Sequence, residues 1–367
     1  MVTPTRSGQN GNGWSTIEWS QSASERGRGD FNALRPPAGA GQIARFLLHD
    51  LNNNQLDDVM PIKLETQPPG VRQTQLMKSL TPVLVLACNR SEFLQRVLNQ
   101  LYKLINGTDN YPVVISQDCD SPATEAVARR FNATYLRQPD QRRIAPPDLS
   151  VDLFDYFAAL KPMLLSDDNV LCISGFNDNG KANNIDMRDP CRLWWTDFFP
   201  GLGWMTTTRL IRELLPKWPK VFWDDWLRES TQRKGRSCIR PEVAKTTTFG
   251  KEGVSAGQFF DNHLAKILLN TKRCLYNNDW IERLQRQRYD KPVTQLADME
   301  TVNVNDIKRR RPSTKPVKIV CSTIKEWKHV CKVLDIMDDI RGGVARNSFK
   351  GVVPTFYYGN RVFVVPP

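Results

Sequence analysis

Two adjacent carboxylates, Asp224 and Asp225, lie between Trp223 and Trp226 in this sequence. A carboxylate placed beside apolar rings loses hydration, which raises its pKa and can tune it for general-base work. The same pair can instead stabilise the positive N-terminus of a short helix predicted at residues 226–230. Residue chemistry alone supports the two interpretations equally.

The stretch around this pair, residues 193–226, is rich in aromatic side chains and is interrupted by prolines and glycines. Only residues 206–215 have the apolar spacing of a helix, and Pro216 ends it because the proline ring removes a backbone donor. We therefore expect loops on both sides of that helix. Together they predict a buried wall around a site.

A second candidate site lies at the ends of two predicted strands. Residues 82–88 and 112–116 are continuous apolar runs, typical of strands buried in a parallel sheet, and a helix beginning at Ser91 separates them. Because ligands of open α/β sheets bind beyond the carboxyl ends of the strands, Arg90 is a candidate for holding a phosphate and Asp118 for binding a ribose or base. A structural ion pair is an equally supported alternative.

Helices and strands continue to alternate along the chain, which predicts an α/β fold. The expected helices are residues 123–131, 152–165 and 258–269, and the expected strands are 133–136, 169–174 and 236–249. A glycine-bearing loop, 250–257, fits either a lid over a ligand or a plain surface loop. A strand at 317–321, a helix at 325–336 and a hairpin at 355–365 turning at Gly359–Asn360 predict a small terminal unit.

These patterns divide the chain into four parts. Residues 1–75 are rich in small and polar residues and are expected to be disordered or stalk-like. Residues 76–289 form the main α/β domain, 290–315 a polar linker, and 316–367 a small α+β domain.

The net charge of +12 favours an anionic partner such as nucleic acid, a phosphate-bearing small molecule or an acidic membrane surface. The basic residues are scattered, however, and their one tight run, 308–311, is typical of a solvated linker. Aromatic and basic residues do not interleave as in RNA-binding proteins, so we expect no nucleic-acid partner. The three histidines lie far apart in the sequence, which argues against a histidine-dependent nucleophile or metal site.

Several longer motifs resemble those of the N-acetylglucosaminyltransferase I family, from about residue 82 to the end of the chain. They include Arg90, Asp118, NDNG at 177–180, TDFFPGLGW at 196–204, FWDDW at 222–226 and TFGKEGVSAGQFF at 248–260. Their order along the chain makes the likeness specific. A sister family that acts on protein O-mannose shares much of this region but usually carries a further sugar-binding domain.

The resemblance implies a nucleotide-sugar glycosyltransferase A-type fold over residues 76–289. It implies transfer of N-acetylglucosamine from UDP-N-acetylglucosamine, with inversion and in β1,2 linkage, to the α1,3-linked mannose of high-mannose N-glycans, with Mn²⁺ as cofactor. Matched residue by residue, Asp224 is the catalytic base, Arg90 and Asp118 hold the uridine-diphosphate end of the donor, and Val254 and Ser255 belong to the loop that orders over it.

The resemblance also pairs Cys88 with Cys119 and Cys172 with Cys238, and it leaves the other four cysteines unpaired: Cys191, Cys274, Cys321 and Cys331. It implies a place on the lumenal side of the Golgi membrane, where an N-terminal signal-anchor holds the family. No apolar run in this chain approaches the roughly 20 residues needed to span a bilayer. We therefore expect no anchor in the chain as it stands.

One departure from the family pattern concerns the metal. The chain passes from Ala145-Pro146-Pro147 directly to Asp148, where the family has a helix and a strand ending in Glu-Asp-Asp. The metal ligand is therefore unassigned, because Asp148 falls shortly after the position of that triplet. The gap predicts an open sheet edge beside residues 83–88 and 113–116 and little or no transfer by this chain, which makes a catalytically inactive relative the competing hypothesis.

Overall fold

The computed structural model describes residues 81–105, 110–117, 120–137, 147–219, 222–249, 251, 259–289 and 296–367. Within those ranges no helix combines the length and apolar character that a bilayer span requires. The expectation of a disordered or stalk-like segment at 1–75 falls outside the described residues. The mixed arrangement of helices and sheets confirms the α/β class and is consistent with a glycosyltransferase.

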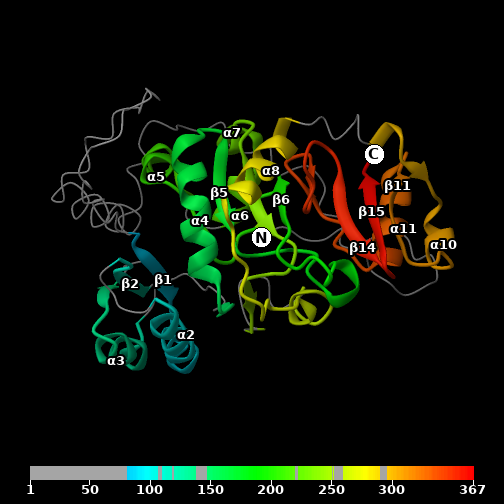
Figure 1. The fold of residues 1–367 in the computed structure, drawn as a ribbon. Helices are drawn as coiled ribbons and strands as arrows, with labels where there is room; N and C mark the ends of the chain where they lie inside the picture. The colour runs from blue at the N-terminus through cyan, green and yellow to red at the C-terminus, as the bar shows by residue number, and fades with distance from the viewer. Residues whose placement is uncertain are drawn as a thin grey trace, which may run out of the picture. The chain divides into compact units, whose positions relative to one another are not determined.

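The first sheet contains three parallel strands in the order β1 (Val83–Ala87), β2 (Val113–Gln117) and β3 (Thr134–Arg137). The helices α2 (Ser91–Leu104) and α3 (Pro122–Arg130) connect them and contact each other (Figure 1). Their buried apolar faces share one core with the strands. The predicted βαβ unit is therefore confirmed, since continuous apolar strands alternate with amphipathic helices.

Strand β1 is an edge of this sheet. Among the described strands it pairs with β2 alone, and its second residue, Leu84, is 37% exposed. An unpaired strand edge leaves backbone donors and acceptors available to another chain or to water. Among the described strands the edge expected beside residues 83–88 is therefore open, whereas the one expected beside 113–116 is wrong, because β2 pairs with β1 on one side and β3 on the other.

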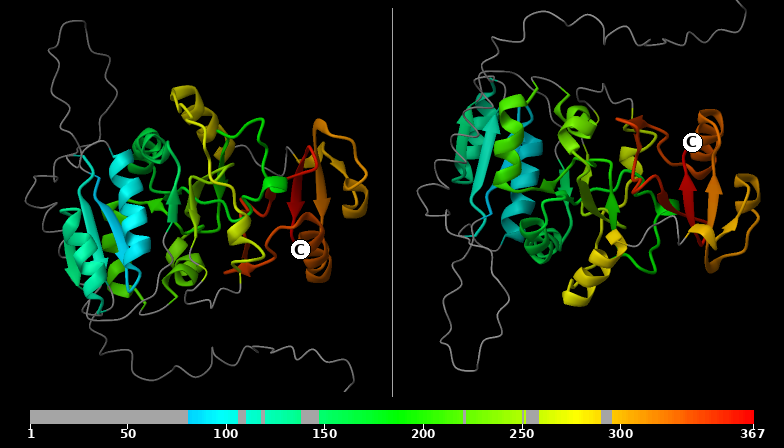
Figure 2. Two further views of the ribbon diagram at one scale, coloured as in Figure 1. Left: turned by 90° about the horizontal axis from the view of Figure 1, so that it is seen from below. Right: turned by 90° about the horizontal axis from the view of Figure 1, so that it is seen from above.

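The second sheet has the order β6–β8–β5–β7. Its strands are β6 (Leu193–Thr196), β8 (Ser237–Pro241), β5 (Val170–Ser174) and β7 (Trp204–Met205). Strands β5 and β8 run parallel, whereas β6 and β7 pair antiparallel with their neighbours. The helix α4 (Leu153–Ser166) buries its apolar side chains against this sheet and lies beside β5, as Figure 2 also shows.

A short antiparallel pair of strands lies just before the start of α4. It joins β4 (Pro147–Leu149) to β9 (Thr246–Thr248). Beside it, Lys245 Nζ lies 2.7 Å from Asp152 Oδ2, and both side chains are fully buried. A buried charge requires such a partner because desolvation is otherwise too costly.

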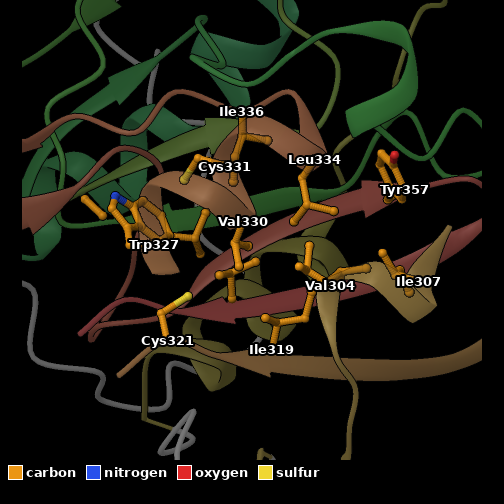
Figure 3. Close-up of a cluster of buried hydrophobic side chains, with 14 of the residues drawn as sticks. Val304, Ile307, Ile319, Cys321, Trp327, Val330, Cys331, Leu334, Ile336 and Tyr357 are labelled. Atoms are coloured by element: carbon orange, nitrogen blue, oxygen red, sulfur yellow. The ribbon is translucent and has the colours of Figure 1, made fainter. Parts of the chain in front are cut away.

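The C-terminal sheet has the order β10–β11–β15–β14. Its strands are β10 (Glu300–Thr301), β11 (Ser313–Val320), β14 (Val353–Tyr357) and β15 (Asn360–Val365). Side chains of α10 (Val304–Ile307) and α11 (Ile324–Leu334) gather over it in one apolar cluster (Figure 3). A small separate hairpin pairs β12 (Ile340–Arg341) with β13 (Val344–Ala345).

Several predicted boundaries differ from the structure. The C-terminal hairpin turns at Tyr358–Gly359 rather than Gly359–Asn360, because Tyr357 pairs with Asn360 and both turn residues have positive φ. The elements β10 and α10 lie inside the range 290–315. The strand-like range 236–249 divides into β8 and β9. The predicted helix 206–215 is α5 (Thr208–Leu214) followed by the 3₁₀ turn η2 (Leu215–Lys217).

The expected helix at 258–269 is wrong over its described part. Only the 3₁₀ turn η3 (Leu264–Lys266) forms there, since Leu268 donates its backbone N–H to Gly180 and Ile267 bridges to Lys181. A helix that we did not predict, α8 (Asn278–Tyr289), follows. Three short elements complete the description: η1 (Ala182–Asn184), α6 (Trp223–Arg228) and α7 (Ser230–Arg233).

The disulfides include one predicted pair and one that sequence matching missed. Cys172 and Cys238 are bonded between the neighbouring strands β5 and β8. Cys191 and Cys274, which we expected to be unpaired, are also bonded, across 83 residues of sequence. Cys88 is disulfide-bonded, and its predicted partner Cys119 lies outside the described residues. Cys321 and Cys331 are buried free thiols.

The contact between Gly203 and Thr246 gives a test of this fold. A Cβ on Gly203 would lie 2.5 Å from Thr246 Cγ2, whereas a Cβ on Gly235 would meet nothing within 4 Å. Both glycines have similar positive φ, 73° and 74°, so the backbone cost of alanine is matched. We expect Gly203→Ala to lower the free energy of unfolding by about 1–3 kcal/mol more than Gly235→Ala, measured by urea denaturation. Equal losses would contradict the packing described here.

Candidate active site

The carboxylates Asp224 and Asp225 lie in the first turn of α6, which begins at Trp223 and not, as predicted, near Trp226. The helix starts earlier because Phe222 adopts a left-handed conformation at the N-cap, with φ of 52°. Negative charge in a first turn interacts favourably with the helix dipole. Neither carboxylate caps the helix by a side-chain hydrogen bond. Only one part of the capping interpretation therefore holds, the favourable interaction of the two charges with the helix dipole.

Both carboxylates bind the same guanidinium, that of Arg228 at the end of α6. Its Nη1 lies 3.0 Å from Asp224 Oδ2 and 2.7 Å from Asp225 Oδ1. The Arg228 side chain is only 7% exposed, and its Nε donates to the carbonyl of Phe199. A buried cation thus fixes the orientation of two acids that would otherwise repel each other.

An aromatic cluster packs behind these acids. Trp223 contacts Trp204, Trp218 and Phe199, with ring centroids 5.7–6.1 Å apart, and Trp226 contacts Trp218 at 5.5 Å. The acids themselves are not enclosed, because the Asp224 and Asp225 side chains are 43% and 44% exposed. The predicted aromatic wall is present, and the carboxylates lie at its solvent edge. Trp204 comes from β7 and Trp223 and Trp226 from α6, whereas Phe199 and Trp218 lie in connecting segments outside helices and strands.

The second predicted site is only partly described. Arg90 follows the carboxyl end of β1 and caps α2, with its guanidinium carbon 5.9 Å from the centre of the Phe93 ring. The parallel register places Ala87 beside Gln117, so the ends of β1 and β2 are neighbours as expected. Asp118 lies outside the described residues, and so do Val254 and Ser255. Their roles remain predictions.

The predicted turn-rich loop at 177–180 is buried and attaches the C-terminal part of the chain. Asp178 forms an ion pair with Arg346, and the Asn179 side chain accepts a hydrogen bond from the backbone of Met337. The loop therefore serves a structural role in the described residues.

The described residues offer no cluster of three or more His, Cys, Asp or Glu side chains suited to a metal ion. Asp148, the acid nearest the missing segment, already binds Arg96 Nη2 at 2.6 Å and Gln100 Nε2 at 2.9 Å. Both of its oxygens accept from donors of α2, so they are directed away from any shared ligand position. Asp148 is therefore a poor fit for the metal ligand that the family resemblance implies.

Sequence reasoning missed Arg228, although a signal was present. Asp224 and Asp225 precede it by four and three residues, the spacing at which helical side chains meet. The predicted helix began at residue 226, after both acids, so the helical spacing between the acids and Arg228 was not recognised.

Comparison with known proteins gives the following. The GNT-I family pattern matches residues 47–149 and 146–367. The two matches overlap at residues 146–149, the position at which we expect a segment to be missing. A protein of Arabidopsis thaliana named alpha-1,3-mannosyl-glycoprotein 2-beta-N-acetylglucosaminyltransferase is 29% identical over 368 residues, which is 87% of this chain and 82% of that protein.

The shared guanidinium predicts a stability difference. Arg228→Met would remove a buried cation, its bond to the Phe199 carbonyl and both carboxylate contacts, so we expect a loss of about 2–3 kcal/mol in unfolding free energy. Arg188→Met is the control: Arg188 pairs with Asp186 at 2.7 Å, but its side chain is 57% exposed, so its loss should lower the free energy of unfolding much less. Chemical denaturation measures both, and similar losses would refute a special role for Arg228.

Proposed function

This chain belongs to the GNT-I family and is a glycosyltransferase, and we propose that it transfers N-acetylglucosamine from UDP-N-acetylglucosamine to an α1,3-linked mannose of high-mannose N-glycans. The transfer inverts the anomeric centre and makes a β1,2 linkage. The name of the Arabidopsis relative, which specifies a mannosyl-glycoprotein acceptor and a 2-beta linkage, supports this proposal.

The observation that carries the proposal is the placement of Asp224. Its carboxylate is half-exposed at the edge of an aromatic cluster, and Arg228 binds its Oδ2. Among the described residues nothing donates to Oδ1, so this oxygen is available to take a proton. In the proposed step Oδ1 removes the proton of the mannose 2-hydroxyl, the hydroxyl oxygen bonds to the anomeric carbon, and the bond from that carbon to UDP breaks.

The donor site is proposed at the carboxyl ends of β1 and β2. Arg90 and Asp118 would hold the uridine-diphosphate end there, and Val254 and Ser255 would cover the donor. The observed position of Arg90, three residues after the end of β1 and at the start of α2, supports this part, since nucleotides bind at that edge of α/β sheets.

The described residues do not form a site that fits Mn²⁺. The family implies Mn²⁺, but Asp148 is engaged by Arg96 and Gln100, and the described part of the chain has no other acid cluster for it. The missing segment supports a second candidate, a folded relative that transfers little or no sugar and keeps a partner-binding surface.

We place the protein on the lumenal side of the Golgi membrane. The disulfides Cys172–Cys238 and Cys191–Cys274 support this location, because such bonds persist in oxidising compartments and are rare in the cytosol.

Asp224→Asn tests the base in a chain with the missing segment restored. We expect transfer to fall about 100-fold or more while donor affinity stays within a few-fold, because a general base acts in the transition state. Asp225→Asn is the matched control, since it binds the same guanidinium with similar exposure and should retain most of the transfer rate. Radiolabelled-donor kinetics measure both variants. Full activity of Asp224→Asn would remove the assignment, and no transfer by the restored parent would remove the proposed function.

A further inference from the structure

We propose that the C-terminal hairpin β12–β13 positions the catalytic base, with Gly342 as the point of contact. The inference rests on the proposed role of Asp224. It assigns to residues 340–345, which are more than 100 positions away in sequence, a direct effect on the reaction.

The backbone of the hairpin lies against the end of α6. A Cβ on Gly342 would lie 2.6 Å from the carbonyl oxygen of Arg228 and 3.3 Å from Glu229 Cα. These are backbone atoms, so they cannot move aside as a flexible side chain can. Gly342 therefore permits a close approach of two backbones, and its φ of 54° is also one that glycine adopts readily.

A stack of three side chains reinforces this contact. The buried Phe198 ring contacts two guanidiniums, those of Arg228 at 4.6 Å and Arg346 at 4.9 Å from its centre. Arg346 follows directly after β13 and pairs with Asp178 and Asp339. Cation–π contacts are strongest when they are desolvated, as here. Arg228, which orients Asp224, and Arg346, which follows the hairpin, thus pack against the same Phe198 ring.

The exposed ion pairs at the same place contribute less. Arg341 lies 4.0 Å from Asp225 and 3.9 Å from Asp339, but its side chain is half-exposed, and such pairs stabilise little. The backbone contact at Gly342 and the packing of Arg228 and Arg346 on Phe198 are therefore the contacts through which the hairpin fixes the position of α6. Since α6 spans only six residues, a shift of Arg228 at its end also moves Asp224 in its first turn.

A pair of neighbouring glycines provides the test. Gly342→Ala must displace the Arg228 backbone, whereas Gly343→Ala changes a glycine of similarly positive φ, 75°, whose Cβ would meet nothing within 4 Å. Amide hydrogen exchange of residues 223–229 is measured in the full 367-residue chain. Transfer kinetics are measured in the chain with the segment restored.

We expect Gly342→Ala to speed exchange in residues 223–229 and to lower kcat roughly 10- to 100-fold with the donor KM unchanged, because small misplacement of a catalytic group is costly. Gly343→Ala should change neither. Equal exchange or equal kcat in the two variants would overturn the positioning role while the proposed function stands. No transfer by the restored parent would instead overturn the proposed function, and the base-positioning role with it.

Discussion

The buried ion pair between Asp152 and Lys245 is the interaction on which the rest of the structure depends. Besides Lys245 Nζ, the Asp152 carboxylate accepts from Ser150 Oγ, Asn270 Nδ2 and the backbone N–H of Cys274. Burial lowers the pKa of Lys245, and the charge of Asp152 opposes that shift. Removing one partner of such a pair commonly costs about 3–5 kcal/mol, because the other charge stays buried.

This pair fixes the junction where the family pattern is interrupted. Lys245 leads into β9, which pairs with β4, and Asp152 directly precedes α4. The backbone N–H groups of Lys245 and Thr246 both donate to Gly175 at the end of β5. The described residues of the junction are therefore held by several backbone and side-chain hydrogen bonds, at the position where we expect a segment of the family to be missing.

Much of the fold was predictable because its signals are local. The first βαβ unit follows from continuous apolar strands and an amphipathic helix, and the C-terminal hairpin follows from alternating residues around a glycine. The hairpin turn was misplaced by one residue, because Tyr358 adopts a positive φ that its residue type does not favour. Residues 259–269 have apolar spacing that resembles a helix, yet their backbone pairs with residues 180–181 and 244, which lie far away in the sequence.

The candidate site was predictable by residue type and not by environment. Asp224 was identified, but its exposure and its guanidinium partner depend on where α6 begins, and that depends on the unusual backbone of Phe222. The disulfide Cys191–Cys274 and the contact of Gly342 with Arg228 join distant segments, so no local pattern indicates them. Packing between distant segments accounts for what sequence reasoning missed.

We propose that this chain keeps the catalytic base of its family, Asp224, but lacks the acid that would hold Mn²⁺. Calorimetric titration of UDP, with and without saturating Mn²⁺, tests it most directly when this chain is compared with one in which the segment is restored. We expect Mn²⁺ to leave UDP affinity unchanged in this chain and to tighten it in the restored one. Tight, Mn²⁺-dependent UDP binding by the 367-residue chain itself would contradict the claim, because Asp148 or another acid would then have to serve as the ligand.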